Sequence, residues 1–95
     1  MTAYVVFIRE RTRSASDMEA YAPAARASFE GHNRSRLAAY GKCETLEGPP
    51  IEGAVIMSFP TMEEAKAWYD SPAYMEARRH RFLGADYRAF ITEGV

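Results

Sequence analysis

The side chains that could bind or transform a small molecule lie mainly between Trp68 and Arg81. Tyrosine and tryptophan combine an apolar body with one polar group, and arginine can hold a carboxylate with two parallel hydrogen bonds. Upstream, His32 is a residue type that can act as a general base when it lines a pocket. We therefore take as candidate ligand contacts Tyr69, Tyr74, Arg81, His32 and Trp68, with His32 and Arg81 as the catalytic candidates.

Each of these residues also has a purely structural explanation. Trp68 and Tyr69 lie at the end of an amphipathic stretch and fit a hydrophobic core. Arg81 would fix a helix to the sheet if it paired with a carboxylate such as Glu47, since a buried, unpaired charge is costly. His32 follows a predicted helix, where it need only bond the last carbonyl groups.

Other chemistries have weaker support. The basic run Arg78–Arg81 stands beside Glu76 in a chain of net charge −1, which favours a solvated helix face over a nucleic-acid site. Cys43 has no second cysteine, and His32 and His80 are not at metal-ligand spacing. We predict no metal site, no bound cofactor and no nucleic-acid partner.

The composition bounds the class of protein. The chain has 95 residues, of which 47% are apolar, so we expect a single domain over residues 1–95. It has no apolar run long enough to cross a membrane and no recognisable leader. With its single cysteine, this pattern predicts a soluble, cytoplasmic protein without a membrane partner.

Local signals predict four strands and three helices. Ser16 with Glu19 and Thr61 with Glu64 have the spacing of capping boxes, and Ser71-Pro72 is a further helix start. Pro23 lies inside the first helix, where we expect a kink. The predicted elements are strands over 3–9, 35–46 (broken at Gly41), 51–59 and 87–93, a helix over 17–30, and two short helices that start at Thr61 and Ser71 and end near Gly84.

This order predicts an α+β fold, βαββαβ, with the second helix split in two. Right-handed crossovers give a ferredoxin-like, four-stranded antiparallel sheet with the first and third strands in the centre and the helices on one face. The two central strands are apolar on both faces. The uncovered face would then expose several large apolar side chains, at about 1.5–3 kcal/mol each. We therefore expect a homodimer that stacks sheet on sheet through the open face.

The stretch from Phe59 to Arg81 resembles the domain-of-unknown-function 1330 family (DUF1330). The residues that match are Phe59, Pro60, Thr61, Ala65, Trp68, Tyr69, Ser71, Pro72, Tyr74, Arg81, Glu93 and Gly94. His32 and Leu46-Glu47-Gly48 also fit, although Asn33-Arg34 replace the Gly-Gly that usually follows the histidine. The resemblance implies a dimeric α/β barrel, a group that includes cofactor-free monooxygenases, lactone isomerases and haem-handling enzymes, and therefore fixes no reaction.

Three hypotheses about function remain open. The first is a homodimer that binds a small, partly apolar or anionic molecule in a cleft between sheet and helices, with or without cofactor-free chemistry. The second is a non-catalytic structural or interaction module, in which the core is filled and Arg81 is fully paired. The third is a monooxygenase-like or haem-handling enzyme, which would need an inward-facing histidine beside open space.

Overall fold

The computed structural model describes residues 1–95 and contains four strands and three helices. In chain order these are β1 (Ala3–Thr12), α1 (Ala15–Ala27), β2 (Ser35–Ala39), β3 (Gly53–Phe59), α2 (Met62–Tyr69), α3 (Pro72–Gly84) and β4 (Ala85–Glu93). The predicted α+β, ferredoxin-like order with a divided second helix is confirmed.

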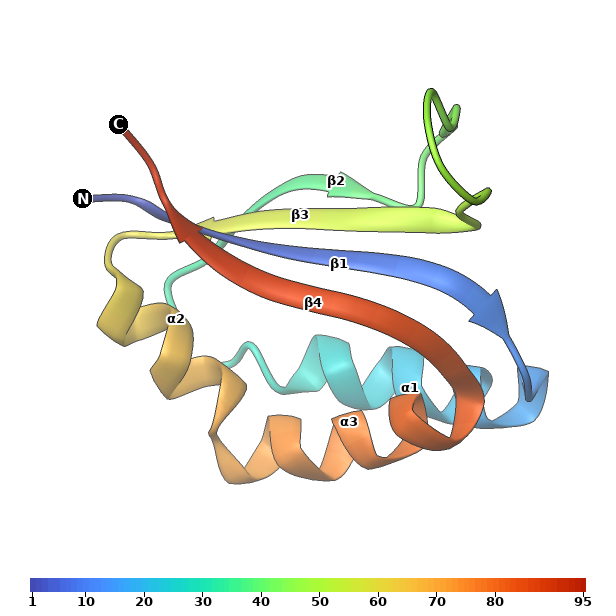
Figure 1. Ribbon diagram of the computed structural model, residues 1–95. Coiled ribbons are helices and arrows are strands. Elements are labelled where there is room, and N and C mark those ends of the chain that lie inside the picture. Colours follow the sequence, from blue (N-terminus) through green and yellow to red (C-terminus); the bar gives the residue numbers. More distant parts are fainter.

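The four strands form one antiparallel sheet in the order β2-β3-β1-β4, so the prediction that the first and third strands are central is also confirmed. All three helices lie against one face of the sheet, and the other face is left without helices (Figure 1). The chain termini lie together at one end, where the Gly94 N–H donates to the Thr2 carbonyl at 2.7 Å.

Side-chain caps start all three helices. Thr61 accepts a hydrogen bond from the Glu64 N–H at 3.1 Å, and Ser71 accepts one from the Tyr74 N–H at 3.3 Å, as predicted. The predicted cap at Ser16 is wrong, because Ser14 accepts from the Asp17 N–H and α1 begins at Ala15. The reason is tertiary: the N–H groups of Arg13 and Ser14 bond the Gly84 carbonyl at 2.7 and 2.9 Å, which fixes the turn two residues earlier.

The predicted second strand is too long. Strand β2 ends at Ala39, because Tyr40 takes a left-handed backbone conformation with φ 57°. Strand β3 begins only at Gly53, so residues 41–46 have no neighbouring strand to pair with. Residues 41–50 are exposed throughout and rise beyond the open face of the sheet (Figure 1).

The core is centred on Trp68, which is 1% exposed. Its ring stacks on Phe29 with centroids 4.7 Å apart, and its Nε1–H donates to the Ser28 hydroxyl at 3.0 Å. The rings of Phe59 and Tyr74 pack on it with centroids 5.7 and 4.1 Å away. This cluster fills the space between α2, α3 and the centre of the sheet, but not the space beneath α1.

Candidate functional site

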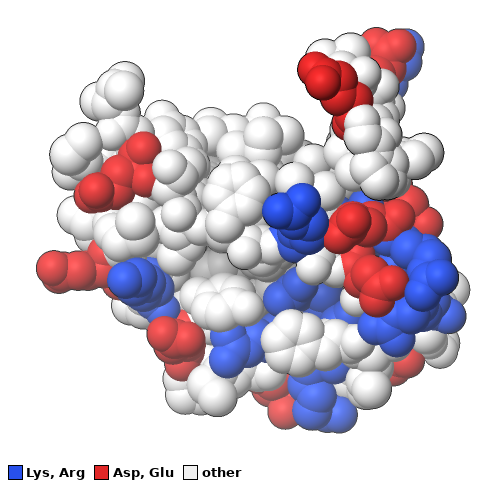
Figure 2. Space-filling view, in the orientation of Figure 1, with Lys and Arg blue, Asp and Glu red and all other residues white.

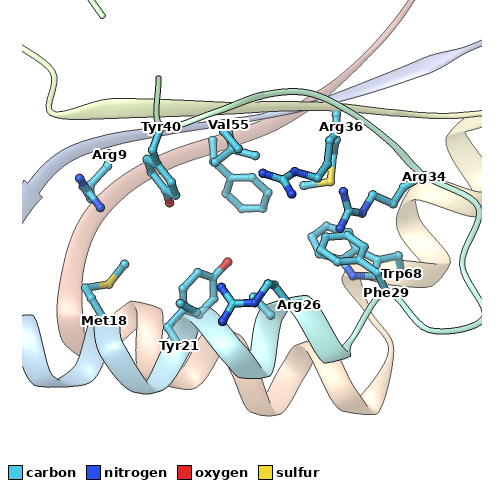
Figure 3. A pocket seen from close by; sticks show the side chains of 15 residues that line it. Arg9, Met18, Tyr21, Arg26, Phe29, Arg34, Arg36, Tyr40, Val55 and Trp68 are labelled. Carbon is cyan, nitrogen blue, oxygen red and sulfur yellow. The ribbon is translucent and has the colours of Figure 1, made fainter. Parts of the chain in front are cut away.

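An open cavity of about 410 Å³ lies between α1 and the part of the sheet formed by β2, β3 and β1 (Figure 3). It exists because small side chains face one another there: Ala22 and Ala25 from α1 and Ala39 from β2. Larger apolar side chains, Phe7 and Met57 among them, form its inner wall. The predicted cleft between sheet and helices is therefore present, on the α1 side.

Four arginines line this cavity, and no carboxylate does: Arg9, Arg26, Arg34 and Arg36. Arg9 is paired with Glu52 at 3.0 Å, whereas the other three make no salt bridge. Burial, and then the positive charge of Arg36, lower the pKa of Arg34. Such mutual repulsion is relieved when an anion binds between the two guanidinium groups.

Strand β2 and the residue before it bring two of these arginines and Ala39 to the cavity. Arg36 pairs with Met57 on the helix side of the sheet, and a bulge at Leu37 then shifts the register so that Ala39, opposite Val55, faces the same side. The guanidinium of Arg34 lies 3.9 Å from the centre of the Phe29 ring, which holds it at the cavity wall. The edge strand β2 and the residue before it thus supply two of the four positive charges.

Tyr40 is held at the cavity by several independent contacts. A side chain on Gly53 would have its Cβ only 2.9 Å from the Tyr40 ring, so the glycine leaves the space that the ring occupies. The Arg9 guanidinium lies 4.7 Å from the ring centre, and the hydroxyl bonds that of Tyr87. A left-handed, non-glycine residue costs about 1–2 kcal/mol and persists where its surroundings hold it.

A second tyrosine pair lies on the opposite side of the cavity. Tyr21, on α1, points from the helix toward the sheet (Figure 3), and its hydroxyl lies 2.7 Å from that of Tyr74 on α3. Burial raises the pKa of Tyr21, and the neighbouring Tyr74 adds to this rise. Partial burial, since Tyr40 is 42% exposed, and then hydrogen bonding to Tyr87 likewise raise the pKa of Tyr40. Both phenols therefore stay protonated and can donate hydrogen bonds at neutral pH.

The residues singled out from the sequence are divided by the fold. Trp68 lines the cavity, and Tyr74 lies directly behind Tyr21. Arg81 is 3% exposed and shares the buried face of α3 with Tyr74. The pairing suggested with Glu47 is wrong, because Glu47 is exposed and forms no salt bridge with Arg81. Two further candidates, His32 and Tyr69, lie outside the cavity lining. The backbone N–H of His32 donates to the Phe29 carbonyl at 2.9 Å. The Arg78 guanidinium lies over the Tyr69 ring, 4.4 Å from its centre.

Sequence reasoning missed the residues that give the cavity its charge and its hydroxyl groups: Arg9, Arg26, Arg34, Arg36, Tyr21 and Tyr40. One signal was visible. Arg34 and Arg36 alternate at the start of a strand, which places both on one face.

The remaining site chemistry is limited. No three His, Cys, Asp or Glu side chains come together in a way that could hold a metal ion. The cavity lining also includes no serine, histidine, cysteine or carboxylate, so phenols and guanidinium groups are its polar residues. None of the helices has the length and apolar character needed to cross a membrane.

Comparison with known proteins gives a family match for the chain and solved structures with the same fold. The model of the family described as "Domain of unknown function (DUF1330)" matches residues 2–95. A search of curated proteins gave no match.

Three solved structures show the same fold. A Rhodopseudomonas palustris protein of unknown function has 19% identity and a TM-score of 0.74, over 99% of this chain and 82% of that one. A dimeric ferredoxin-like protein of unknown function from Thermobifida fusca has 16% identity and a TM-score of 0.65, over 97% and 90%. SnoaB, a cofactor-independent oxygenase from Streptomyces nogalater, has 8% identity and a TM-score of 0.60, over 99% and 92%.

Proposed function

The chain belongs to the DUF1330 family, and from this premise we propose that it forms a homodimer in which each protomer binds a small, partly apolar anion in the cavity beneath α1. The observation that carries the binding proposal is the lining of the cavity. Three arginines without carboxylate partners surround a space walled by aromatic and aliphatic side chains. A flat carboxylate would satisfy both the charge and the apolar wall.

The open face of the sheet supports the dimer. Ile56, Val6 and Phe90 lie side by side across β3, β1 and β4 on the face away from the helices. Phe90 is 48% exposed in the single chain, and the surface above the sheet carries little charge between its two ends (Figure 2). A second copy is the occupant we favour, because two solved structures with this fold are described as dimeric.

Binding, rather than a particular reaction, is what this site supports. A nucleophile needs an adjacent base, and the cavity lining contains neither a serine or cysteine nor a histidine or carboxylate. The likeness to SnoaB extends to the fold at 8% identity, and fold alone assigns no activity. A cofactor-free reaction would therefore have to rely on Tyr21 or Tyr40 for proton transfer.

The arginines provide the direct test. We expect 2-naphthoate to bind the wild-type protein, and the double variant Arg34→Gln/Arg36→Gln to bind it at least about tenfold more weakly, since each charge-assisted contact contributes about 1.5–3 kcal/mol. Isothermal titration calorimetry at low and high salt would measure this loss. Thermal melting should change little, because neither arginine has a carboxylate partner to lose.

The matched control removes two positive charges elsewhere. Lys66→Gln/Arg79→Gln alters exposed positions on α2 and α3 that do not line the cavity, and it should bind 2-naphthoate like the wild type. Equal weakening by both double variants would mean that net charge alone attracts the anion. No binding by the wild type, together with a lower melting temperature for Arg34→Gln/Arg36→Gln, would favour the non-catalytic structural module.

A further inference from the structure

Arg81 carries a buried positive charge that no carboxylate balances. Its side chain is 3% exposed, it makes no salt bridge, and its Nε has no hydrogen-bond partner. The rings of Phe7, Phe82 and Tyr87 surround it, with centroids 5.1, 5.1 and 5.0 Å from the guanidinium carbon. Such a group is expensive to bury, so its position suggests a role beyond packing.

The nearest buried polar group on the same helix face is the Tyr74 hydroxyl. Tyr74 precedes Arg81 by two turns of α3, and both side chains contact the Phe7 ring. A guanidinium can donate hydrogen bonds but cannot accept them. Its field therefore favours the rotamer in which the Tyr74 oxygen faces Arg81 and the Tyr74 proton points away, toward Tyr21.

The direction of the hydrogen bond between Tyr74 and Tyr21 determines whether the Tyr21 hydroxyl can donate to a ligand. If Tyr74 donates to the Tyr21 oxygen across the 2.7 Å contact, the proton of Tyr21 is free to point into the cavity. We propose that Tyr21 is a hydrogen-bond donor to a second oxygen of the ligand, and that Arg81 and Tyr74 are positioning residues that orient it. This inference rests on the proposed function, because it assumes that an anion occupies the cavity.

The position of Tyr21 relative to the arginines narrows the class of ligand. Tyr21 lines the cavity from α1, whereas Arg34 and Arg36 line it from the β2 side. In Figure 3 the two arginines lie near Phe29 and Trp68, and Tyr21 lies nearer the end of the cavity marked by Met18. The geometry thus fits a flat carboxylate with a hydrogen-bond acceptor, such as a carbonyl or enolate oxygen, at its opposite end.

A matched pair of probes tests this. We would titrate 4-acetylbenzoate, which has an acceptor opposite its carboxylate, and 4-isopropylbenzoate, which is of similar size and has a methyl group in place of the carbonyl oxygen. Wild-type protein should bind 4-acetylbenzoate about 3- to 10-fold more tightly, the typical effect of one net hydrogen bond. Tyr21→Phe should abolish this preference and leave the affinity for 4-isopropylbenzoate unchanged, because the ring remains.

The positioning residues are tested by the same ratio, which a purely structural role would not change. Tyr74→Phe should reduce the preference for 4-acetylbenzoate, since the remaining Tyr21 hydroxyl loses its fixed orientation. Arg81→Met should reduce the preference for 4-acetylbenzoate as well. If the Arg81→Met protein does not fold, the Tyr74→Phe result alone decides the test. Tyr69→Phe removes a hydroxyl outside the cavity lining and is the control that should retain the wild-type ratio.

The outcomes separate this inference from the proposed function. If both probes bind and Arg34→Gln/Arg36→Gln weakens both, but Tyr21→Phe keeps the preference, the anion site stands and the role of Tyr21 is wrong. If the wild-type protein bound the two probes equally well, the proposed role of Tyr21 would also be wrong, and the anion site would stand. If neither probe binds the wild-type protein, the role of Tyr21 and the anion site are both contradicted.

Discussion

The two faces of the sheet start from the same apolar alternation and end in different environments. On the helix side Phe7 and Met57 are each 3% exposed, whereas on the open side Phe90 is 48% exposed. The polar residues differ as well, because the arginines and tyrosines of the cavity lie on the helix side. An apolar sheet face can thus be buried in two ways. The chain's own helices can cover it, here leaving a cavity, or a second molecule can cover it.

The gap on the helix side has a specific cause. The helices α2 and α3 bring the large side chains Trp68 and Tyr74 to the core, while α1 brings Ala22 and Ala25 to the cavity. Where α1 presents only these two alanines, it cannot fill the space above an edge strand to interior density. In the proposed dimer, the open face packs against the sheet of a second copy. Two apolar sheet faces can pack on one another without leaving a cavity of this kind.

The largest expected effect is on the open face. Ile56→Glu would place a charge in the middle of the row formed with Val6 and Phe90, and a two-fold axis would introduce it twice. Burying an uncompensated carboxylate costs several kcal/mol, so we expect the dimer to weaken by at least about 100-fold. Light scattering coupled to size-exclusion chromatography would then report a monomer.

Ala67→Glu is the control, because it adds the same charge at an exposed position on α2. It should leave the assembly unchanged. A wild-type protein that is monomeric at micromolar concentration would contradict the dimer outright. Circular dichroism should show that Ile56→Glu remains folded, since its side chain lies on the face away from the core.

An intermediate effect is expected from filling the gap on the helix side. Ala22→Leu would project a larger side chain into the cavity and should weaken 2-naphthoate binding at least about tenfold, while the free energy of unfolding stays equal or rises by up to about 1 kcal/mol. Ala20→Leu makes the same change on the exposed side of α1. If Ala22→Leu instead destabilised the protein and left binding intact, the cavity would not be the binding site.

The smallest effect concerns three tyrosine hydroxyls on the helix side. Three of the six tyrosines, Tyr21, Tyr40 and Tyr74, have raised pKa values in the folded chain, chiefly through burial. In the unfolded chain these phenols ionise near their ordinary value of about 10. The folded state then holds more protons above that pH, so stability is fully present below about pH 10 and is lost as the pH rises further.

Urea unfolding at a series of alkaline pH values would measure this loss. Tyr21→Phe removes one of the three groups, and we expect its free energy of unfolding to fall less steeply above pH 10 than that of the wild type. An identical slope for the two proteins would show that the Tyr21 phenol is as easily ionised in the folded state as in the unfolded one.

Local signals in the sequence were sufficient to predict most of the fold. The caps at Thr61 and Ser71, and the central strands that are apolar on both faces, depend on residues a few positions apart, so the chain alone determined the element order and the central pair of strands. Where a boundary depended on a distant partner, the sequence failed. The Gly84 carbonyl, 70 residues from Ser14 in the chain, sets the start of α1, and the start of β3 limits the length of β2.

The candidate site was decided almost entirely by tertiary structure. Aromatic and basic residues between Trp68 and Arg81 attracted attention because they are dense in the sequence, yet of these only Trp68 lines the cavity. The phenol pair of Tyr21 and Tyr74 joins positions 53 apart, and Tyr40 meets Tyr87 across 47 residues. Such contacts depend on how α1 and α3 pack together on the sheet and on how the end of β2 meets β4, and no spacing along the chain encodes that packing.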